Sequence, residues 1–475
     1  MKILFAGSEL TPFARTSVLG DVLAGLPAAL LAAGHEVSVV LPCYRGFRDD
    51  PRLAASATGV RFTVPLGDCA ADVEVLKARA PNGVSLFLVR HDPSFDRAGL
   101  YSDDGSDFPD DAERFVLFSK CVVELARRIS PAVDIVHLHD WHAALVPALI
   151  KARRLPFKTV LTIHSLASQG SFPSTAFPLT NLPWSWFAPQ GLEFYGKFNL
   201  LKSGILFGDA VTGSERLAHQ AQTPAGGDGL EAVLRENAHK ITGVLNGIDS
   251  TVWDPATDKL LPKTYKTSAL SGKKACRAAL LKQLNLAPDP AGPVFGMVTP
   301  LSDDSGVELL LPVIDRMLSS DARLVVVGPG ESAHERDLMI ASRRHRDRMA
   351  YVPRGDDRLV HLLHAGADAF LMPSHGDPCG LTAMSALKYG ALPIAQANGS
   401  AAEIVPDHDP RSDTGCGFLF YDASAEALWD TIKRAKKSFA DTALWKRLTQ
   451  RAMGADFSWS KAGARYEEVY LRLVS

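Results

Sequence analysis

The sequence predicts an α/β protein with two Rossmann-like domains that face each other across a cleft. Its 475 residues exceed what one hydrophobic core usually organises, so at least two domains are expected. Its composition, 46% hydrophobic and 22% charged, is that of a globular protein. Short apolar runs alternate with segments of helical periodicity in two separate series, which is typical of parallel doubly wound sheets.

The first series begins with the apolar run 3–6, which predicts a buried strand ending at Gly7. Apolar side chains then recur at helical spacing between Leu19 and Leu31, and Gly34 is typical of the residue that follows a helix. Further strands are expected at residues 36–41, 133–138, 159–163, 210–213 and 241–245.

The second series follows residues 249–270, a segment rich in Asp, Pro, Thr and Lys that we interpret as a linker. Its strands are expected at residues 293–299, 324–327, 369–372 and 392–395. We therefore place one domain at residues 1–250 and the other at residues 256–455. Ligands of such sheets bind at the carboxyl ends of the strands, so polar motifs directly after strands are the candidate site.

Charge and cysteine content exclude several classes of protein. The net charge of -2 gives no reason to expect nucleic acid or anionic lipid as a partner. The six cysteines show no CxxC pairing and are typical of a reducing compartment, so we expect a cytoplasmic protein. The N-terminus is interpreted as a first strand rather than a signal peptide, and no apolar run is long enough to predict a membrane span.

A histidine-rich motif, HLHDWH, covers residues 137–142 at the end of a predicted strand. A metal site is one interpretation, but His137 and His139 alternate within the strand, whereas His142 falls on the next helical turn. We favour a polar sugar-binding loop and no metal. This loop comprises His139, Asp140, Trp141 and His142.

Two further motifs follow strands. His164 ends the run TIH and is either a core histidine or a substrate contact, and its place beside the expected cleft favours contact with substrate. Residues 371–382 run from a strand into a helix that starts near Leu381. The free amides of a helix N-terminus form an anion site, and Asp377 could contact sugar hydroxyls. The alternative for this segment is a simple turn with a helix cap.

Taken together, these motifs resemble the bacterial glycogen synthase and plant starch synthase family. Further matches are FPDDAERF at 108–115, YGK at 195–197, LNGID at 245–249, GCGFLF at 415–420 and FSW at 457–459. The resemblance covers nearly the whole chain. It implies the GT-B glycosyltransferase fold, with an acceptor-side N-terminal domain, a nucleotide-sugar-side C-terminal domain and the last helix, 456–475, packing on the first domain. It also implies ADP-glucose as donor, an α-1,4-glucan such as glycogen as acceptor, retention of configuration, and neither metal nor cofactor.

The resemblance also assigns site residues. It places His164 under the anomeric centre, and Asp377 at the position of a glutamate that contacts the glucose. It implies donor-binding roles for Arg15, Thr16, Gly20, Asp21, Asn246, Cys379, Gly380, Leu381 and Thr382.

The differences from the family pattern gather on the diphosphate subsite. Pro300 and Ser305 stand where the family segment S-R-L-x-x-Q-K-G has its arginine and lysine, and Asp303 and Asp304 add negative charge. Arg15 replaces the lysine of K-T-G-G-L-G-D, and Ser17 and Val18 replace its two glycines. A valine does not easily adopt a positive φ, and its side chain would fill space that a phosphate needs.

Without a metal, charge that grows on the leaving diphosphate must be stabilised by cations and amides. Each charged hydrogen bond contributes about 1.5–4 kcal/mol, so losing two predicts a rate lower by about 10²- to 10⁵-fold. We therefore predict strongly impaired glucosyl transfer. The alternatives are a working synthase with a rewired donor site, a transferase for another sugar donor, and a non-catalytic paralogue. Such a paralogue would bind glucan or regulate a partner, such as an active glycogen synthase.

Overall fold

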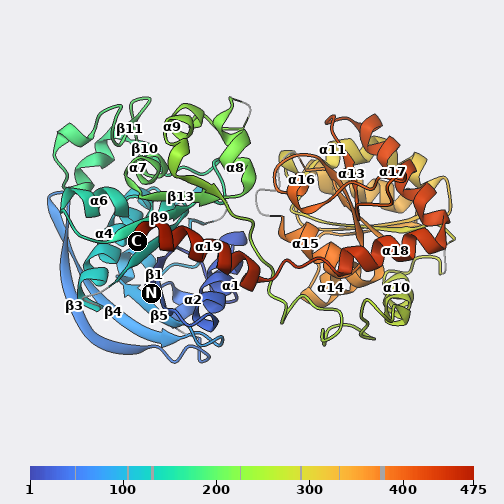
Figure 1. The fold of residues 1–475 in the computed structure, drawn as a ribbon, viewed down its shortest axis with the longest axis horizontal. Helices are drawn as coiled ribbons and strands as arrows, with labels where there is room; N and C mark the ends of the chain where they lie inside the picture. The colour runs from blue at the N-terminus through green and yellow to red at the C-terminus, as the bar shows by residue number, and fades with distance from the viewer. Residues whose placement is uncertain are drawn as a thin grey trace. The chain divides into compact units, whose positions relative to one another are not determined.

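The computed structural model describes residues 1–48, 50–103, 106–129, 133–224, 226–288, 291–330, 332–374 and 380–475. The chain forms two compact units (Figure 1). The first contains Met1–Gly247 together with Trp459–Ser475, and the second contains Ile248–Ser458. None of the helices in the described residues is long and apolar enough to cross a membrane.

The first unit is built on a nine-stranded sheet in the order β14-β13-β9-β8-β1-β2-β5-β4-β3, counted over the described residues. Seven of these strands pair in parallel. They are β1 (Lys2–Ala6), β2 (Glu36–Pro42), β5 (Ser85–Arg90), β8 (Ile135–His139), β9 (Lys158–Thr162), β13 (Ala210–Gly213) and β14 (Ile241–Gly243).

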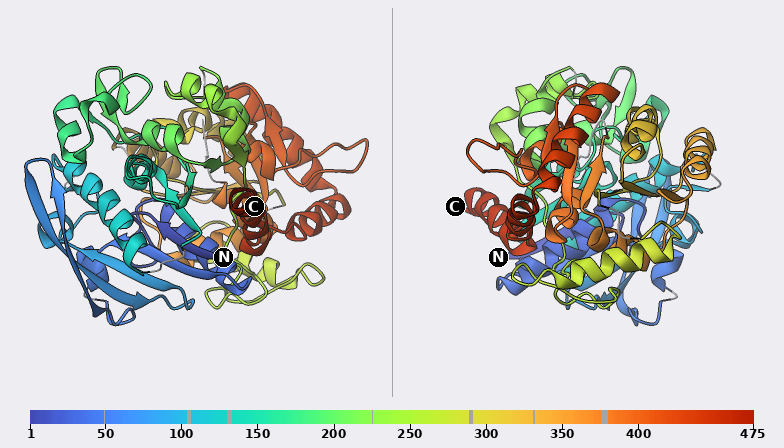
Figure 2. Two further views of the ribbon diagram at one scale, coloured as in Figure 1. Left: turned by 60° about the vertical axis from the view of Figure 1, so that its left-hand side comes forward. Right: turned by 90° about the vertical axis from the view of Figure 1, so that its right-hand side faces the viewer.

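One edge of this sheet differs from the purely parallel arrangement that the alternation predicts. β3 (Ser56–Leu66) and β4 (Cys69–Arg79) form an antiparallel hairpin beside β5, seen as the long light-blue strands in Figures 1 and 2. Gly67, with φ of 62°, lies in the tight connection between them. Exposed and half-buried residues alternate along β3, as expected for a strand with one solvated face. The sequence analysis did not predict this hairpin, because β3 alternates exposed and half-buried residues and is not a continuous apolar run.

Helices cover the parallel part of the sheet. The longer ones are α1 (Val18–Ala32), α4 (Asp111–Ile129), α6 (Val146–Ala152), α7 (Leu200–Phe207) and α19 (Trp459–Val474). α19, dark red, lies against α1 although the two are far apart in sequence (Figures 1 and 2). A side chain at Gly25 of α1 would put its Cβ 2.0 Å from the Trp459 indole nitrogen, so only glycine permits this packing. In addition, the Tyr470 hydroxyl of α19 lies 2.7 Å from Nδ1 of His137 in β8.

The smaller elements of this unit lie in its connections. They are α2 (Arg45–Arg48), α3 (Asp92–Phe95), α5 (Asp140–Ala143), α8 (Glu215–His219), α9 (Glu231–Glu236), β6 (Ser102–Asp103), β7 (Ser106–Asp107), β10 (Ser171–Pro173), β11 (Glu193–Phe194) and β12 (Lys197–Asn199).

The second unit contains a parallel sheet in the order β17-β16-β15-β18-β19-β20, again over the described residues. Its strands are β15 (Val294–Val298), β16 (Arg323–Val327), β17 (Met349–Val352), β18 (Ala369–Met372), β19 (Leu392–Gln396) and β20 (Phe418–Phe420). Its helices are α10 (Ser271–Gln283), α11 (Val307–Leu310), α12 (Ile314–Leu318), α13 (Ser332–Arg344), α14 (Asp357–Gly366), α15 (Leu381–Lys388), α16 (Ala401–Ile404), α17 (Ala425–Ala440) and α18 (Thr442–Met453). This is the doubly wound arrangement that the second series predicts.

Candidate functional site

In the first unit, the loop between β1 and α1 is organised around the buried carboxylate of Glu9, which is 1% exposed. This carboxylate accepts hydrogen bonds from the backbone N–H groups of Thr16 (2.8 Å) and Ser17 (2.9 Å). It also accepts them from both of their hydroxyls, at 2.7 and 2.9 Å, and from the Tyr101 hydroxyl at 2.9 Å. The loop's amides are therefore bound to an anion that the chain itself supplies.

The loop retains one cation, Arg15, whose guanidinium lies 2.9 Å from the Asp21 carboxylate in the first turn of α1. Asp21 also accepts a hydrogen bond from the Thr11 hydroxyl at 2.8 Å. A Cβ at Gly20 would lie 2.9 Å from that same hydroxyl oxygen. The structure thus brings Arg15 and Thr16 of the loop together with Gly20 and Asp21 of α1, the four residues here to which the family resemblance assigns donor binding.

The difficulty expected of a valine at a position that needs a positive φ does not arise, because Val18 does not adopt a positive φ. Ser17 has φ of -140° and ψ of -178°, and its hydroxyl oxygen accepts a hydrogen bond from the Leu19 N–H as the N-cap of α1. Val18 is the first residue of that helix. A helix N-cap adopts an extended conformation that any residue can reach, so the loop requires no positive φ here.

Histidines at the ends of β8 and β9 form a contact pair. Nδ1 of His139 lies 3.0 Å from Nε2 of His164, and the two rings stack at 5.3 Å. The His164 backbone N–H donates to the Asp140 carboxylate at 2.7 Å. Asp140 has φ of 54°, a left-handed conformation that turns the chain sharply from β8 into α5.

Burial sets the protonation of this group. It lowers the pKa of His164 to about 4 and the pKa of His139 well below its ordinary value. It raises the pKa of Asp140 to about 7. At neutral pH the two imidazoles are therefore uncharged.

Trp141 and His142 lie in a cluster of aromatic rings, whereas His139 contacts another histidine. The His142 ring stacks on Trp141 at 4.0 Å and on Tyr101 at 4.7 Å, and Phe115 packs edge-on against both Trp141 and His142. Burial lowers the pKa of His142 to about 3. Among the described residues, no group of three or more His, Cys, Asp or Glu side chains could hold a metal ion.

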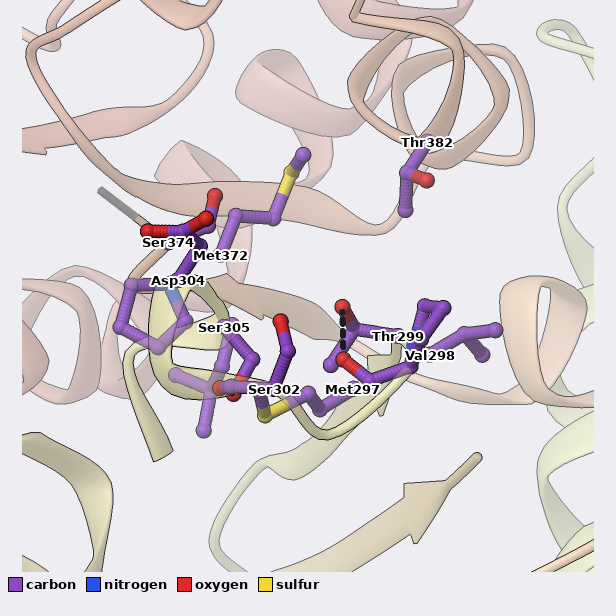
Figure 3. Close-up of a pocket in the computed structure, with 12 residues that line it drawn as sticks. Met297, Val298, Thr299, Ser302, Asp304, Ser305, Met372, Ser374 and Thr382 are labelled. Carbon is purple, nitrogen blue, oxygen red and sulfur yellow. Dashed lines mark hydrogen bonds between the residues drawn. The ribbon is translucent and has the colours of Figure 1, made fainter. Parts of the chain in front are cut away.

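In the second unit, a cavity of about 280 Å³ lies at the carboxyl ends of β15 and β18. Its described lining residues are Met297, Val298, Thr299, Pro300, Ser302, Asp304, Ser305, Leu371, Met372, Pro373, Ser374 and Thr382. Figure 3 shows Ser302 and Ser305 of the loop after β15 on one side and Thr382 of α15 on the other. Within this described lining, Asp304 is the charged residue, and neither lysine nor arginine is present.

The loop after β15 is fixed by its own hydrogen bonds. Ser305 is 3% exposed, and its hydroxyl donates to the Ser302 carbonyl at 2.6 Å. Gly306 follows with φ of 72°, and a Cβ there would lie 2.2 Å from the carbonyl oxygen of Pro373. Gly306 therefore allows the loop to contact the segment after β18, and this contact holds residues 300–305 at the cavity.

Helix α15 begins beside the cavity. Gly380 is its N-cap, with φ of 69°, and the first turn contains no acidic side chain. Gly380, Leu381 and Thr382 thus form the helix start that the sequence predicts, and Thr382 lines the cavity. Asp377 and Cys379 lie outside the described residues. Asn246 follows β14 in the first unit.

Sequence reasoning missed Glu9 and Tyr101. Glu9 lies three residues after the predicted first strand, and that position near a strand's carboxyl end was a usable signal. Tyr101 had no such signal, because it meets Glu9 only through a contact that spans 92 residues.

Comparisons with known proteins agree with this architecture. Residues 2–236 match the family model for the starch synthase catalytic domain, and residues 283–452 match that for glycosyl transferases group 1. A glycogen synthase of Opitutus terrae is 41% identical over 479 residues, covering 99% of each chain. One of Koribacter versatilis is 38% identical over 478 residues, covering 99% of this chain and 98% of the relative.

Solved structures give the same result. The catalytic domain of Starch Synthase IV from Arabidopsis thaliana, bound to ADP and acarbose, superposes with a TM-score of 0.91 and 29% identity. The match covers 100% of this chain and 99% of that one. A sucrose-phosphate synthase from Thermosynechococcus elongatus shares the fold, with a TM-score of 0.60 at 18% identity over 99% and 98% of the two chains. The chain has the GT-B fold and belongs to the glycogen synthase and starch synthase family.

Proposed function

We propose that this chain binds an α-1,4-glucan and transfers glucose to its non-reducing end from ADP-glucose, with retention, at a strongly reduced rate. The reaction follows from membership of the family. The Arabidopsis starch synthase bound to ADP and acarbose supports an adenine nucleotide as the donor's leaving group. The reduced rate rests on one observation, the absence of any cation from the described lining of the cavity at β15 and β18.

The chemistry explains why this absence matters. As the glycosidic bond breaks, negative charge grows on the diphosphate, and a site accelerates the step only by stabilising that charge more than the ground state. In the second unit the described lining offers only neutral donors, among them the hydroxyls of Ser302, Ser374 and Thr382, together with amides at the start of α15. Asp304 opposes them, since like charges repel by about 1–4 kcal/mol at contact distance, depending on the local dielectric.

The amides of the loop between β1 and α1 do not replace the missing charge. Its Thr16 and Ser17 amides are bound to Glu9, so an incoming phosphate would compete with a buried carboxylate. Arg15 is easier to recruit, because it is 56% exposed and an exposed ion pair with Asp21 contributes only about 0–1 kcal/mol. We propose Arg15 as the remaining cation for the donor.

The neutral His139 and His164 pair is the proposed sugar-binding element. Uncharged imidazoles can hydrogen-bond hydroxyl groups without attracting a competing ion. His164, which is 6% exposed, is the member of the pair nearer to solvent, whereas His139 is fully buried. No step of the proposed reaction needs a metal or an organic cofactor, so we expect chelators to leave the rate unchanged.

The test is incorporation of radiolabelled glucose into glycogen by the purified full chain, compared under one set of conditions with the Opitutus terrae glycogen synthase. We expect kcat/KM with ADP-glucose to be lower than that of the relative by about 10²- to 10⁵-fold. Equal rates would refute the impairment. Retention of glycogen binding should be measured in parallel by affinity electrophoresis.

The same assay separates the alternatives. Faster transfer from UDP-glucose or GDP-glucose than from ADP-glucose would show a different sugar donor. Glycogen binding without transfer from any donor would show a non-catalytic glucan-binding paralogue, and the chain should then be added to an active glycogen synthase to test for regulation.

A further inference from the structure

The second unit contains another cavity, of about 730 Å³, between the start of α10 and the junction of α17 with α18. We propose that it binds a small phosphorylated metabolite, with the phosphate held by Lys274 and Lys446. The proposal does not depend on the proposed transferase function.

This cavity lies at the opposite edge of the sheet from the candidate donor cavity. Asp368, which lines it, immediately precedes β18, and its carboxylate accepts a hydrogen bond from the N–H of Val294, the first residue of β15 (2.9 Å). The cavity of about 280 Å³ lies where the same two strands end. The two cavities share no lining residue among those described.

The lining is strongly positive in a chain whose net charge is -2. Its charged members are Lys273, Lys274, Arg277, Lys446 and Asp368. Three of them bind within the protein. The Lys273 ammonium donates to the carbonyls of Ala365, Ala367 and Tyr389, and Arg277 lies 3.1 Å from Asp368.

Lys274 and Lys446 are different, because both are exposed and neither has a hydrogen-bond or ion-pair partner in the described part of the chain. Two unpartnered ammonium groups on one cavity favour an anion with several oxygen atoms. A neutral glucan would leave both ammonium groups without a counter-charge.

Uncharged donors point to the same class of ligand. α10 begins here without a side-chain cap and without an acidic residue in its first turn, and Ser271 of that turn lines the cavity. Free amides at the start of a helix attract phosphate. Trp445 also lines the cavity. It is only 8% exposed, and its indole N–H is buried without a hydrogen-bond partner among the described residues.

The rest of the wall suits an organic body attached to the phosphate. Phe439 is half-buried and packs edge-on against Trp445 at 5.2 Å, and both line the cavity. Small-molecule sites usually enclose about 300–1,000 Å³ with mostly apolar walls and a few polar groups. A sugar phosphate and a nucleoside monophosphate both meet this description, since they share the phosphate chemistry.

The test is titration calorimetry of the full chain with glucose 6-phosphate, AMP, inorganic phosphate and, as an uncharged probe, maltose. The variant is Lys274→Gln with Lys446→Gln, which should fold normally because neither side chain has a described partner. The matched control is Lys259→Gln with Lys437→Gln, which removes two exposed lysines of the same unit that do not line the cavity.

We expect at least one phosphorylated probe to bind the wild type and the control alike, and the double variant about tenfold or more weakly. Binding of glucose 6-phosphate but not AMP would identify a sugar phosphate site, and the reverse a nucleotide site. A Trp445→Phe variant should lose a ligand-dependent change in fluorescence. The proposal is overturned if no phosphorylated probe binds at millimolar concentration, or if the double variant binds as tightly as the control.

Discussion

Restoring the two cations is the most direct perturbation of the candidate donor cavity. The variant Pro300→Arg with Ser305→Lys places both charges on a loop that already lines it. Pro300 is exposed and has no backbone N–H to lose, so an arginine fits without disturbing a hydrogen bond. At position 305, the lysine replaces a side chain that lines the cavity, and Gly306, which allows the contact with Pro373, is unchanged.

The magnitude follows from the hydrogen bonds that the variant adds and removes. Two charged hydrogen bonds to the diphosphate would contribute about 1.5–3 kcal/mol each. Each 1.4 kcal/mol is about tenfold in rate, so kcat/KM should rise by about 10²- to 10⁴-fold. Because Asp304 will pair with part of the new charge, we expect the lower half of this range. Loss of the hydrogen bond from Ser305 to the Ser302 carbonyl should cost about 1 kcal/mol of stability.

The assay is glucosyl transfer from ADP-glucose to glycogen. The control variant, Pro300→Gln with Ser305→Gln, changes the same positions without adding charge, so it separates charge from release of the proline. The reasoning is refuted if the charged variant is folded and gains nothing over the control. It is also refuted if the wild type already matches the Opitutus terrae relative.

Three further predictions concern the architecture of the two units. Glu9→Gln should lower the free energy of unfolding by about 2–4 kcal/mol, because a neutral amide replaces a carboxylate that accepts five hydrogen bonds. Chemical denaturation measures this loss, and the control Glu36→Gln, at an exposed glutamate, should show no comparable loss. Gly306→Ala should be less stable than Gly34→Ala by about 2 kcal/mol or more. Both glycines have positive φ, but only at Gly306 would the added Cβ meet a backbone oxygen. Equal melting temperatures of the two variants would contradict this. Burial lowers the pKa of His142 to about 3 in the folded chain, whereas in the unfolded chain the ring has its ordinary pKa of about 6.5. As the pH falls below about 6.5, the unfolded chain therefore binds a proton that the folded chain does not, and the free energy of unfolding decreases. Between about pH 7 and about pH 5 the wild type should lose about 2 kcal/mol more than His142→Gln, and parallel pH profiles of the two would show that the ring is not buried as a neutral group.

The sequence by itself determined the fold class and the positions of the main motifs. Apolar runs followed by helical spacing predicted most of the parallel strands of both units, because a strand buried on both faces must be apolar throughout, but they missed β5, β17 and β20. The same logic placed His139 and His164 at strand ends and Leu381 at the start of α15. The family motifs identified Pro300 and Ser305 as departures, and the structure places both on one cavity.

The tertiary structure alone decided how the site's polar groups are satisfied. In the folded chain the amides of Thr16 and Ser17 donate to Glu9, and His139 contacts His164 at the end of the neighbouring strand. The β3–β4 hairpin at the edge of the first sheet is also evident only in the structure. The same is true of the cavity that α10 and the α17–α18 junction line together. Periodicity records which face of an element is buried, but not which distant side chain meets it there. Hydrogen bonds such as the one between Glu9 and Tyr101 depend on contacts that form only when the chain folds.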